Sequence, residues 1–221
     1  GRDPGAVGPS ALYEKNITLS IARAIKEELS RRSDANVILT REGDQFMGLK
    51  NRTALANERG GKLFISIHVD ANPVSRLRGH TIYFMGPAKT EIARQVAQFE
   101  NSVIKFEKSQ QHYDGLSNTS IILAANAQNS YNKESQDLAA YIDEEMQEEC
   151  DSKSLGVRQA GFYVLHGASM PNILIESGFI TNRYDRQRLQ NTGYHRRIAK
   201  AVADGIIRFK QRYESPALSA N

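Results

Sequence analysis

The fold of this chain is decided by the stretch KLFISIH, residues 62–68. Its apolar side chains follow one another almost without a break, instead of alternating with polar ones. Such a run is expected of a central strand that is buried on both faces of a sheet. Helical patterns stand on both sides of it in the chain, so the stretch predicts an α/β sheet with helices covering both of its faces.

The remaining elements are expected at defined positions. Residues 13–32 repeat an apolar side chain every four residues, which predicts one helix with a single buried stripe. Residues 89–107 show a second such pattern on Ile92, Val96, Phe99 and Val103. Further helices are expected at 49–59, 135–149 and 194–213, and strands at 36–40, 80–85, 161–165 and 172–176. We predict a single α/β domain with a twisted mixed sheet.

Composition narrows the class of protein. The 221 residues are 40% hydrophobic and 24% charged, as in globular proteins, and no apolar run approaches the roughly 20 residues that span a bilayer. The formal net charge of +4 gives mild attraction to anionic partners, but the basic residues are scattered among acidic ones. We therefore expect no nucleic-acid surface. The single cysteine, Cys150, has no intramolecular disulfide partner, and we expect it to face solvent.

Three polar side chains stand at the ends of predicted elements. His68 ends the apolar run, Glu176 ends the run NILIE, and Glu14 opens the first helix, where the helix dipole favours an anion. Ligands of open α/β sheets bind outside the carboxyl ends of the strands. Imidazole nitrogen and carboxylate oxygen are zinc ligands, and a further acid can serve as general base for water. The three residues are candidates for a hydrolytic zinc site.

Each of the three also has a simpler interpretation. Glu14 is equally placed to be a plain first-turn residue, and His68 to be a hydrogen-bonded core histidine. Glu176 is harder to explain in this way. A carboxylate that directly follows Ile-Leu-Ile must be paired, solvated or functional, because burying it alone costs too much free energy. The residues by themselves leave these alternatives open.

Six stretches, in order, carry a resemblance to a known family. They are GRDPGAVG followed by YEKN, then VILTR, NRTALAN, LFISIHVDAN, GVRQAGFYVL and MPNILIESGFITN. Over nearly its whole length the chain resembles the Amidase_3 family of N-acetylmuramoyl-L-alanine amidases. The resemblance implies a sheet of about six strands and Zn²⁺-dependent hydrolysis of the amide between N-acetylmuramic acid and L-alanine in peptidoglycan, in cell separation or wall remodelling. It implies Glu14 and His68 as zinc ligands and Glu176 as the catalytic group.

The chain differs from the family's pattern at its N-terminal end. The family's opening motif begins with a strand and a histidine ligand, which would precede Gly1, and His80, His112, His166 and His195 lie outside its ligand positions. A truncated or partly represented chain is the simplest explanation. Two alternatives follow: a non-catalytic peptidoglycan-binding or regulatory domain that has lost its zinc, and a zinc peptidase or deacetylase.

Residues 89–133 are expected to form a helical regulatory insertion within the domain. The insertion resembles that of division-associated amidases of Gram-negative bacteria, in which a helix covers the site and lends a glutamate to the zinc until an activator protein removes it. Glu100 matches that glutamate, and a solvated helix residue is the alternative. Residues 121–127, IILAANA, are expected either to contact the activator or to pack as an ordinary helix.

Two other side chains are candidates near the site. Arg52 in NRTALAN and Asn72, four residues after His68, are expected either to orient the substrate and ligands or to be structural. Together these expectations describe a monomeric enzyme in the periplasm or at the cell wall.

Overall fold

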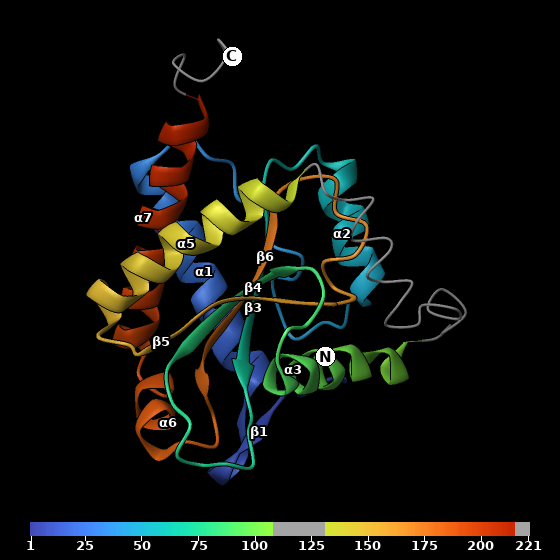
Figure 1. The fold of residues 1–221 in the computed structure, drawn as a ribbon, viewed down its shortest axis with the longest axis vertical. Helices are drawn as coiled ribbons and strands as arrows, with labels where there is room; N and C mark the ends of the chain where they lie inside the picture. Colours follow the sequence, from blue (N-terminus) through green and yellow to red (C-terminus); the bar gives the residue numbers. More distant parts are fainter. Residues whose placement is uncertain (108–130, 215–221) are drawn as a thin grey trace.

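A computed structural model describes residues 1–107 and 131–214. Its centre is a mixed four-stranded sheet in the order β3-β6-β4-β5 (Figure 1). The strands are β3 (Phe64–Asp70), β6 (Asn172–Phe179), β4 (His80–Met85) and β5 (Ser154–Ala160). β6 is parallel to β3 and antiparallel to β4, and β4 is parallel to β5. The predicted α/β class is confirmed. The run at residues 62–68 forms a strand as predicted, but β3 lies at the edge of the described sheet, and Ile65 and Ile67 are only partly buried.

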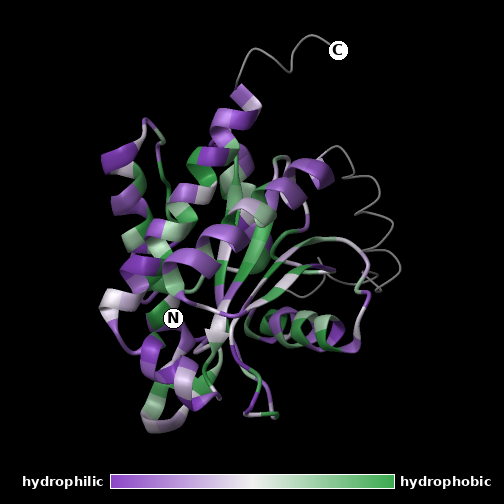
Figure 2. Cartoon of the chain, turned by 60° about the vertical axis from the view of Figure 1, so that its left-hand side comes forward, coloured by the Kyte–Doolittle hydropathy of each residue, from purple (hydrophilic) through white to green (hydrophobic). Residues whose placement is uncertain are grey.

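Helices cover both faces of this sheet. One face packs against α1 (Glu14–Arg32), α5 (Asn132–Cys150) and α7 (Thr192–Glu214), and the other against α2 (Leu49–Glu58) and α3 (Glu91–Asn101). Successive residues of β4 belong to different cores: Ile82 lies in the first and Tyr83 in the second. In Figure 2 the strands are largely hydrophobic, whereas the helices alternate between hydrophobic and hydrophilic residues. Every residue of β4 and β6 is buried, and burial on both faces accounts for the nearly unbroken apolar sequences of these two strands.

Two predicted strands are wrong. Residues 36–40 form no strand, because no described strand lies beside them to receive their backbone hydrogen bonds. Residues 161–165 contain a turn, and the strand of that region is β5, which ends at Ala160. The central sheet consequently has four described strands rather than about six. A short antiparallel pair that was not predicted, β1 (Val7–Gly8) and β2 (Leu12–Tyr13), flanks the 3-10 turn η1 (Pro9–Ala11).

The outer edge of β3 borders a large cavity. Among the described strands β3 pairs with β6 alone, so its other edge has no strand partner. A cavity of about 890 Å³ runs along this edge and is lined by β3, by residues 34–41 and by side chains of α1 and α2. Such an edge presents backbone N–H and C=O groups that are available for pairing. Residues 36–40, which were predicted to form a strand, also line this cavity.

The predicted helices are confirmed for α1, α2, α5 and α7, with ends that differ by at most three residues. Residues 89–107 instead divide into α3 and the 3-10 turn η2 (Ser102–Phe106). Ile92 and Phe99 were predicted to share a buried stripe but are 40% and 45% exposed. The buried residues of α3 are Ala93, Val96, Ala97 and Glu100. The helix α6 (Arg183–Leu189) was not predicted.

The prediction for Cys150 is also wrong. Its side chain is fully buried at the end of α5, where it packs in the first core. Burial raises the pKa of the Cys150 thiol to about 12. The thiolate form is therefore scarce at neutral pH, and the side chain acts as a small hydrophobic residue.

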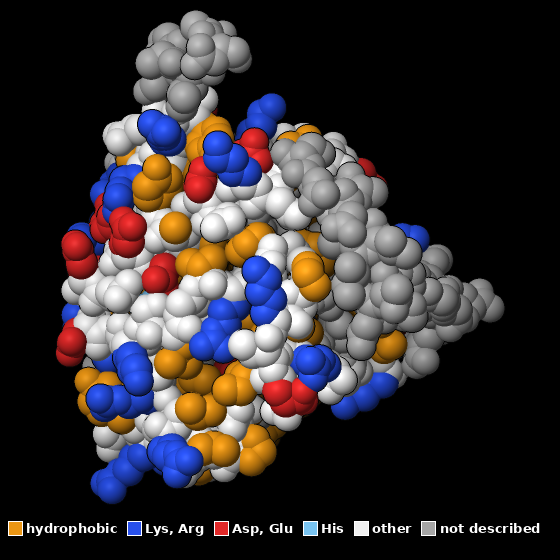
Figure 3. Space-filling view, viewed as in Figure 1, with side chains coloured by type: hydrophobic (Ala, Val, Ile, Leu, Met, Phe, Trp, Pro, Cys, Tyr) orange, Lys and Arg blue, Asp and Glu red, His pale blue; other side chains and the backbone are white. Residues whose placement is uncertain are grey.

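The surface mixes charges of both signs. On the face that Figure 3 shows, lysine and arginine side chains are spread among acidic, hydrophobic and other residues. Within the described ranges, no helix is long and apolar enough to cross a membrane.

Helices α5 and α7 approach closely at Gly205, which gives a first testable prediction. A Cβ at this position would lie 2.5 Å from Cγ1 and 2.8 Å from Cα of Ile142. We expect Gly205→Ala to lower the free energy of unfolding by about 1–3 kcal/mol, because overpacking outweighs the better helix propensity of alanine. Urea unfolding followed by circular dichroism measures this change. An unchanged midpoint would mean that the two helices separate without cost.

Candidate metal centre

Glu14 is fixed by backbone donors at the start of α1. Its Oε2 accepts a hydrogen bond from the Ala6 N–H at 2.7 Å, and its Oε1 accepts one from the Val69 N–H at 3.2 Å. Gly5 has a φ of +67°, and a Cβ there would lie 2.4 Å from Oε2, so the approach requires glycine. Glu14 is 5% exposed. It is therefore buried against β3 rather than solvated on the first turn of a helix.

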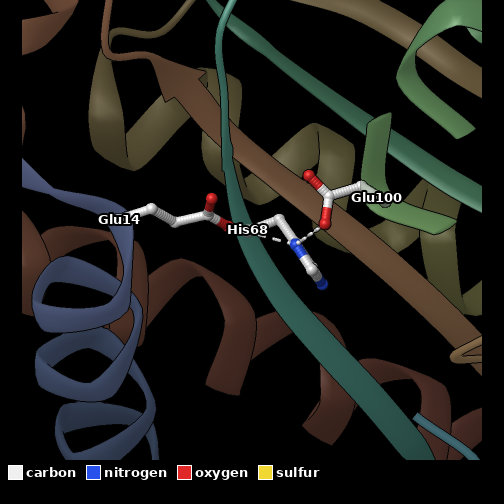
Figure 4. Close-up of side chains that lie close together, drawn as sticks. All are labelled: Glu14, His68 and Glu100. Atoms are coloured by element: carbon white, nitrogen blue, oxygen red, sulfur yellow. Dashed lines mark ion pairs between the residues drawn. The ribbon is translucent and has the colours of Figure 1, made fainter. Parts of the chain in front are cut away.

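His68 lies on β3 between two carboxylates. Its Nδ1 is 3.1 Å from Glu14 Oε1 and 2.7 Å from Glu100 Oε2 (Figure 4). Although both oxygens are close, Nδ1 is buried and makes no well-directed hydrogen bond. On the other side of the ring, Nε2 lies 2.9 Å from Ser66 Oγ. When Nε2 carries the proton and donates to Ser66, Nδ1 presents its lone pair to the carboxylates, as a metal-ligating histidine does.

Glu100 completes the group from the opposite side. It lies on the buried stripe of α3, is 6% exposed, and points toward His68 in Figure 4. One ligand atom from each of Glu14, His68 and Glu100 lies within 4.8 Å of the others. Three elements that are distant in sequence, α1, β3 and α3, thus bring together one nitrogen and two carboxylate donors. The alternative that Glu100 is a solvated helix residue is wrong.

Two further buried carboxylates border this group. Glu176 pairs in register with His68 across β3 and β6, is 1% exposed, and neither of its carboxylate oxygens has a hydrogen-bond partner. Asp70 follows His68 by two residues and is 6% exposed. Asp70 was not among the predicted site residues. The signal was present, since Asp70 stands at the same strand end as His68.

The crowding of these acids perturbs their protonation. Burial, together with the charges of Asp70 and Glu100, raises the pKa of Glu176 well above its usual value. Burial and the charge of Glu100 raise the pKa of Asp70 to about 7. Burial also raises the pKa of Glu100. For His68, burial lowers the pKa, but the charges of Glu100 and Glu14 outweigh it and the net pKa is well above the usual value. The crowding therefore disfavours the charged forms of these carboxylates, and a bound cation would stabilise those forms.

The donor set fits zinc. Imidazole nitrogen and carboxylate oxygen are its common protein ligands, and a buried Nδ1 without a hydrogen bond is free to ligate. Two other histidines that the structure describes have different partners. His80 lies within 3.0 Å of Ser152 and Asp143 side chains, and His195 bonds Ser20 and the Leu189 carbonyl. His112 lies outside the described residues.

Arg52 and Asn72 take different places. Arg52 is among the residues that line the cavity next to the site, and its Nε donates to the Met47 carbonyl at 3.2 Å. Burial lowers the pKa of Arg52, and the negative charges of Asp3 and Glu100 partly compensate. Asn72 instead closes a turn, since its Oδ1 accepts a hydrogen bond from the Val74 N–H at 2.9 Å. This geometry favours the structural interpretation for Asn72.

Comparison with known proteins decides the family. The model of the Amidase_3 family, N-acetylmuramoyl-L-alanine amidase, matches residues 1–208. The chain belongs to this family. AmiA of Salmonella typhimurium is 31% identical over 212 residues, which cover 95% of this chain and 72% of AmiA. AmiC of Neisseria meningitidis serogroup B is 31% identical over 211 residues, and the match spans half of that protein.

Solved amidases share the fold. An N-acetylmuramoyl-L-alanine amidase from Clostridium difficile 630 is 24% identical with a TM-score of 0.72, over 97% of this chain and 93% of that one. AmiC2 of Nostoc punctiforme is 26% identical with a TM-score of 0.70, over 96% and 94% of the two chains. The resemblance that the sequence stretches indicated is confirmed. The Glu14–His68–Glu100 group therefore lies in a chain of the N-acetylmuramoyl-L-alanine amidase family.

Proposed function

We propose that this chain is the catalytic domain of a zinc-dependent N-acetylmuramoyl-L-alanine amidase that cuts the amide between N-acetylmuramic acid and L-alanine in peptidoglycan. The observation that carries the proposal is the buried group of Glu14, His68 and Glu100, with Glu176 beside it in register, in a chain of this family. A protein that acts on this substrate works in the periplasm or at the cell wall, and we place it there.

Glu14 and His68 would hold the zinc, together with the histidine that the family resemblance places before Gly1. When bound, zinc supplies a Lewis acid that polarises the scissile carbonyl and acidifies water. Glu14 is prepared for this role because two backbone N–H groups fix its carboxylate. Ser66 prepares His68 by holding the far side of its ring.

Glu176 would be the general base and acid. Its carboxylate has no hydrogen-bond partner and is held next to His68 by the pairing of β3 and β6. It would take the proton of the attacking water and then pass it to the nitrogen of the departing L-alanine. Arg52 carries a positive charge toward the same space and would orient an oxygen of the substrate.

The cavity beside β3 would accommodate the strand that the family resemblance places ahead of Gly1. The cavity along the free edge of β3 is lined on its far side by Val37, Ile38 and Leu39. A strand in this cavity would pair with β3, and its neighbour at residues 36–40 would gain the partner it lacks. Such a strand would end near His68, which is where a further zinc ligand is needed.

We also propose that the resting enzyme is self-inhibited. Glu100 brings its carboxylate to 2.7 Å from His68 Nδ1, where it would take a coordination position that catalysis needs. An activator would open the site by binding the open form more tightly, because only differential affinity shifts such an equilibrium. The amidase CwlD of Clostridioides difficile, 23% identical, has been solved in complex with the lipoprotein GerS. Residues 121–127, the expected contact, lie outside the described residues.

Product analysis tests the proposed activity. The full-length protein, loaded with zinc, should release free stem peptide from purified muropeptides, and a chelator should stop the release because the chemistry requires the metal. His68→Ala should bind zinc more weakly and lose the activity, whereas His195→Ala, which alters a histidine remote from the group, should keep both. Acetate or shortened peptides as products would contradict the assignment. Absence of any product from zinc-loaded protein would favour a wall-binding domain instead.

A further inference from the structure

The segment that follows Glu100 is anchored at two points. At the first, Asn101 Nδ2 donates to the Gly161 carbonyl and Asn101 Oδ1 accepts from the Tyr163 N–H, both at 2.8 Å. At the second, Glu107 Oε1 accepts a hydrogen bond from the Leu49 N–H at 2.7 Å. The segment therefore bridges the turn after β5 and the beginning of α2. Glu100 stands directly next to the first anchor and seven residues before the second.

The second anchor caps a helix from a distance. Leu49 is the first residue of α2, so its N–H has no partner within the helix. Gly48, at the N-cap position, has no side chain to satisfy it. The carboxylate of Glu107, 58 residues away in sequence, takes this place. A negative charge at a helix N-terminus also interacts favourably with the helix dipole.

Gly48 makes room for this carboxylate. A Cβ at position 48 would lie 2.7 Å from Glu107 Oε2 and 2.8 Å from its Cδ. The backbone of Gly48, with φ −60° and ψ 152°, is one that any residue adopts. A side chain at position 48 is therefore opposed by space and not by conformation, because the flexible end of Glu107 would have to move away. The contact can therefore be broken in two ways, by removing the Glu107 carboxylate or by adding a side chain at position 48.

We propose that Glu107 is a positioning residue which, seated on Gly48 and Leu49, forms a clasp that holds Glu100 against His68. The intervening turn η2 transmits the restraint from Glu107 to Glu100, because its residues Val103 and Ile104 are partly buried and pack against the second core. With the clasp closed, α3 cannot lift Glu100 away without uncovering the first N–H of α2. With the clasp open, Asn101 and the packing of α3 alone retain the helix. The clasp rests on the proposed function in one respect, the assignment of Glu100 as the blocking residue.

Two single substitutions test the clasp from its two sides. Glu107→Ala removes the carboxylate, and Gly48→Ala fills its seat while Glu107 stays intact. In the full-length protein, both should raise amide hydrogen exchange in α3 and η2 by roughly 10- to 100-fold, the factor that a hydrogen bond to a charged group contributes. Exchange in α7 should stay unchanged, which shows that the fold is intact. Both variants should also raise the amidase rate without an activator.

Matched variants and a double-mutant cycle complete the test. Gly43→Ala, in the same loop but with only the Gln45 side chain 4.0 Å away, should have no effect. Glu107→Gln keeps an acceptor oxygen without the charge and should give an intermediate effect. The double variant should exchange no faster than either single variant, because both break one contact.

The outcomes separate the clasp from the proposed function. Hydrogen exchange reports the clasp even when no variant cleaves peptidoglycan, and in that case only the proposed function fails. Unchanged exchange in α3 for either Glu107→Ala or Gly48→Ala would overturn the clasp. Faster exchange without any rise in the basal rate of an active enzyme would also overturn it, since Glu107 would then stabilise the segment without positioning Glu100.

Discussion

Replacement of Glu176 by glutamine is expected to lower amidase turnover by about 10²–10⁴-fold while zinc binding is retained. Glutamine has nearly the same size as glutamate but cannot accept the proton of the attacking water. Glu176 is 1% exposed, and its two oxygens have no hydrogen-bond partner, so no other described contact depends on its charge. Its register with His68 places it at the candidate metal centre. The loss should therefore appear in kcat and not in folding.

Two measurements on the full-length protein check this expectation: the zinc content per chain and the turnover of purified sacculi. Glu149→Gln is the matched control, because Glu149 is a surface carboxylate that pairs with Lys200 at 2.6 Å, far in sequence from the site. It should leave turnover unchanged. Near wild-type turnover in Glu176→Gln would show that another group moves the proton.

Replacement of Glu100 by alanine is expected to raise the basal rate, measured without any activator, by up to roughly 100-fold. That factor corresponds to the release of a resting state in which about one molecule in 100 is open. The physical reason is the 2.7 Å approach of Glu100 Oε2 to His68 Nδ1, which occupies a position that catalysis requires to be free. Removal of the carboxylate also relieves part of the negative charge around Asp70 and Glu176.

The matched control for Glu100 lies on the same helix. Gln98→Ala changes the exposed face of α3 and should leave the basal rate as it is. In the presence of saturating activator, Glu100→Ala and the wild type should turn over at similar rates, because both are then open. Equal basal rates for the two without activator would show that Glu100 does not block the site.

Local patterns in the sequence indicated most elements and three candidate site residues, His68, Glu176 and Glu14. The apolar run at residues 62–68 and the four-residue spacing of α1 indicated a buried strand and an amphipathic helix, because burial dictates side-chain type residue by residue. His68 and Glu14 were recognisable since each stands where such an element ends or begins. Glu100 was reached only through the family resemblance, because the stripe predicted for its helix did not include it; the structure places it on the buried face of α3.

Only the tertiary structure decided which elements meet. Residues 36–40 have the composition of a strand yet form none, since a strand exists only through hydrogen bonds to a neighbour and here a cavity lies in the neighbour's place. Cys150 has a polar local sequence and is nevertheless buried, because α5 packs against α7. Likewise, the approach of Glu100 to His68 depends on how α3 crosses the sheet. Contacts of this kind join residues far apart in the chain, and their geometry is set by packing of the whole domain rather than by any local pattern.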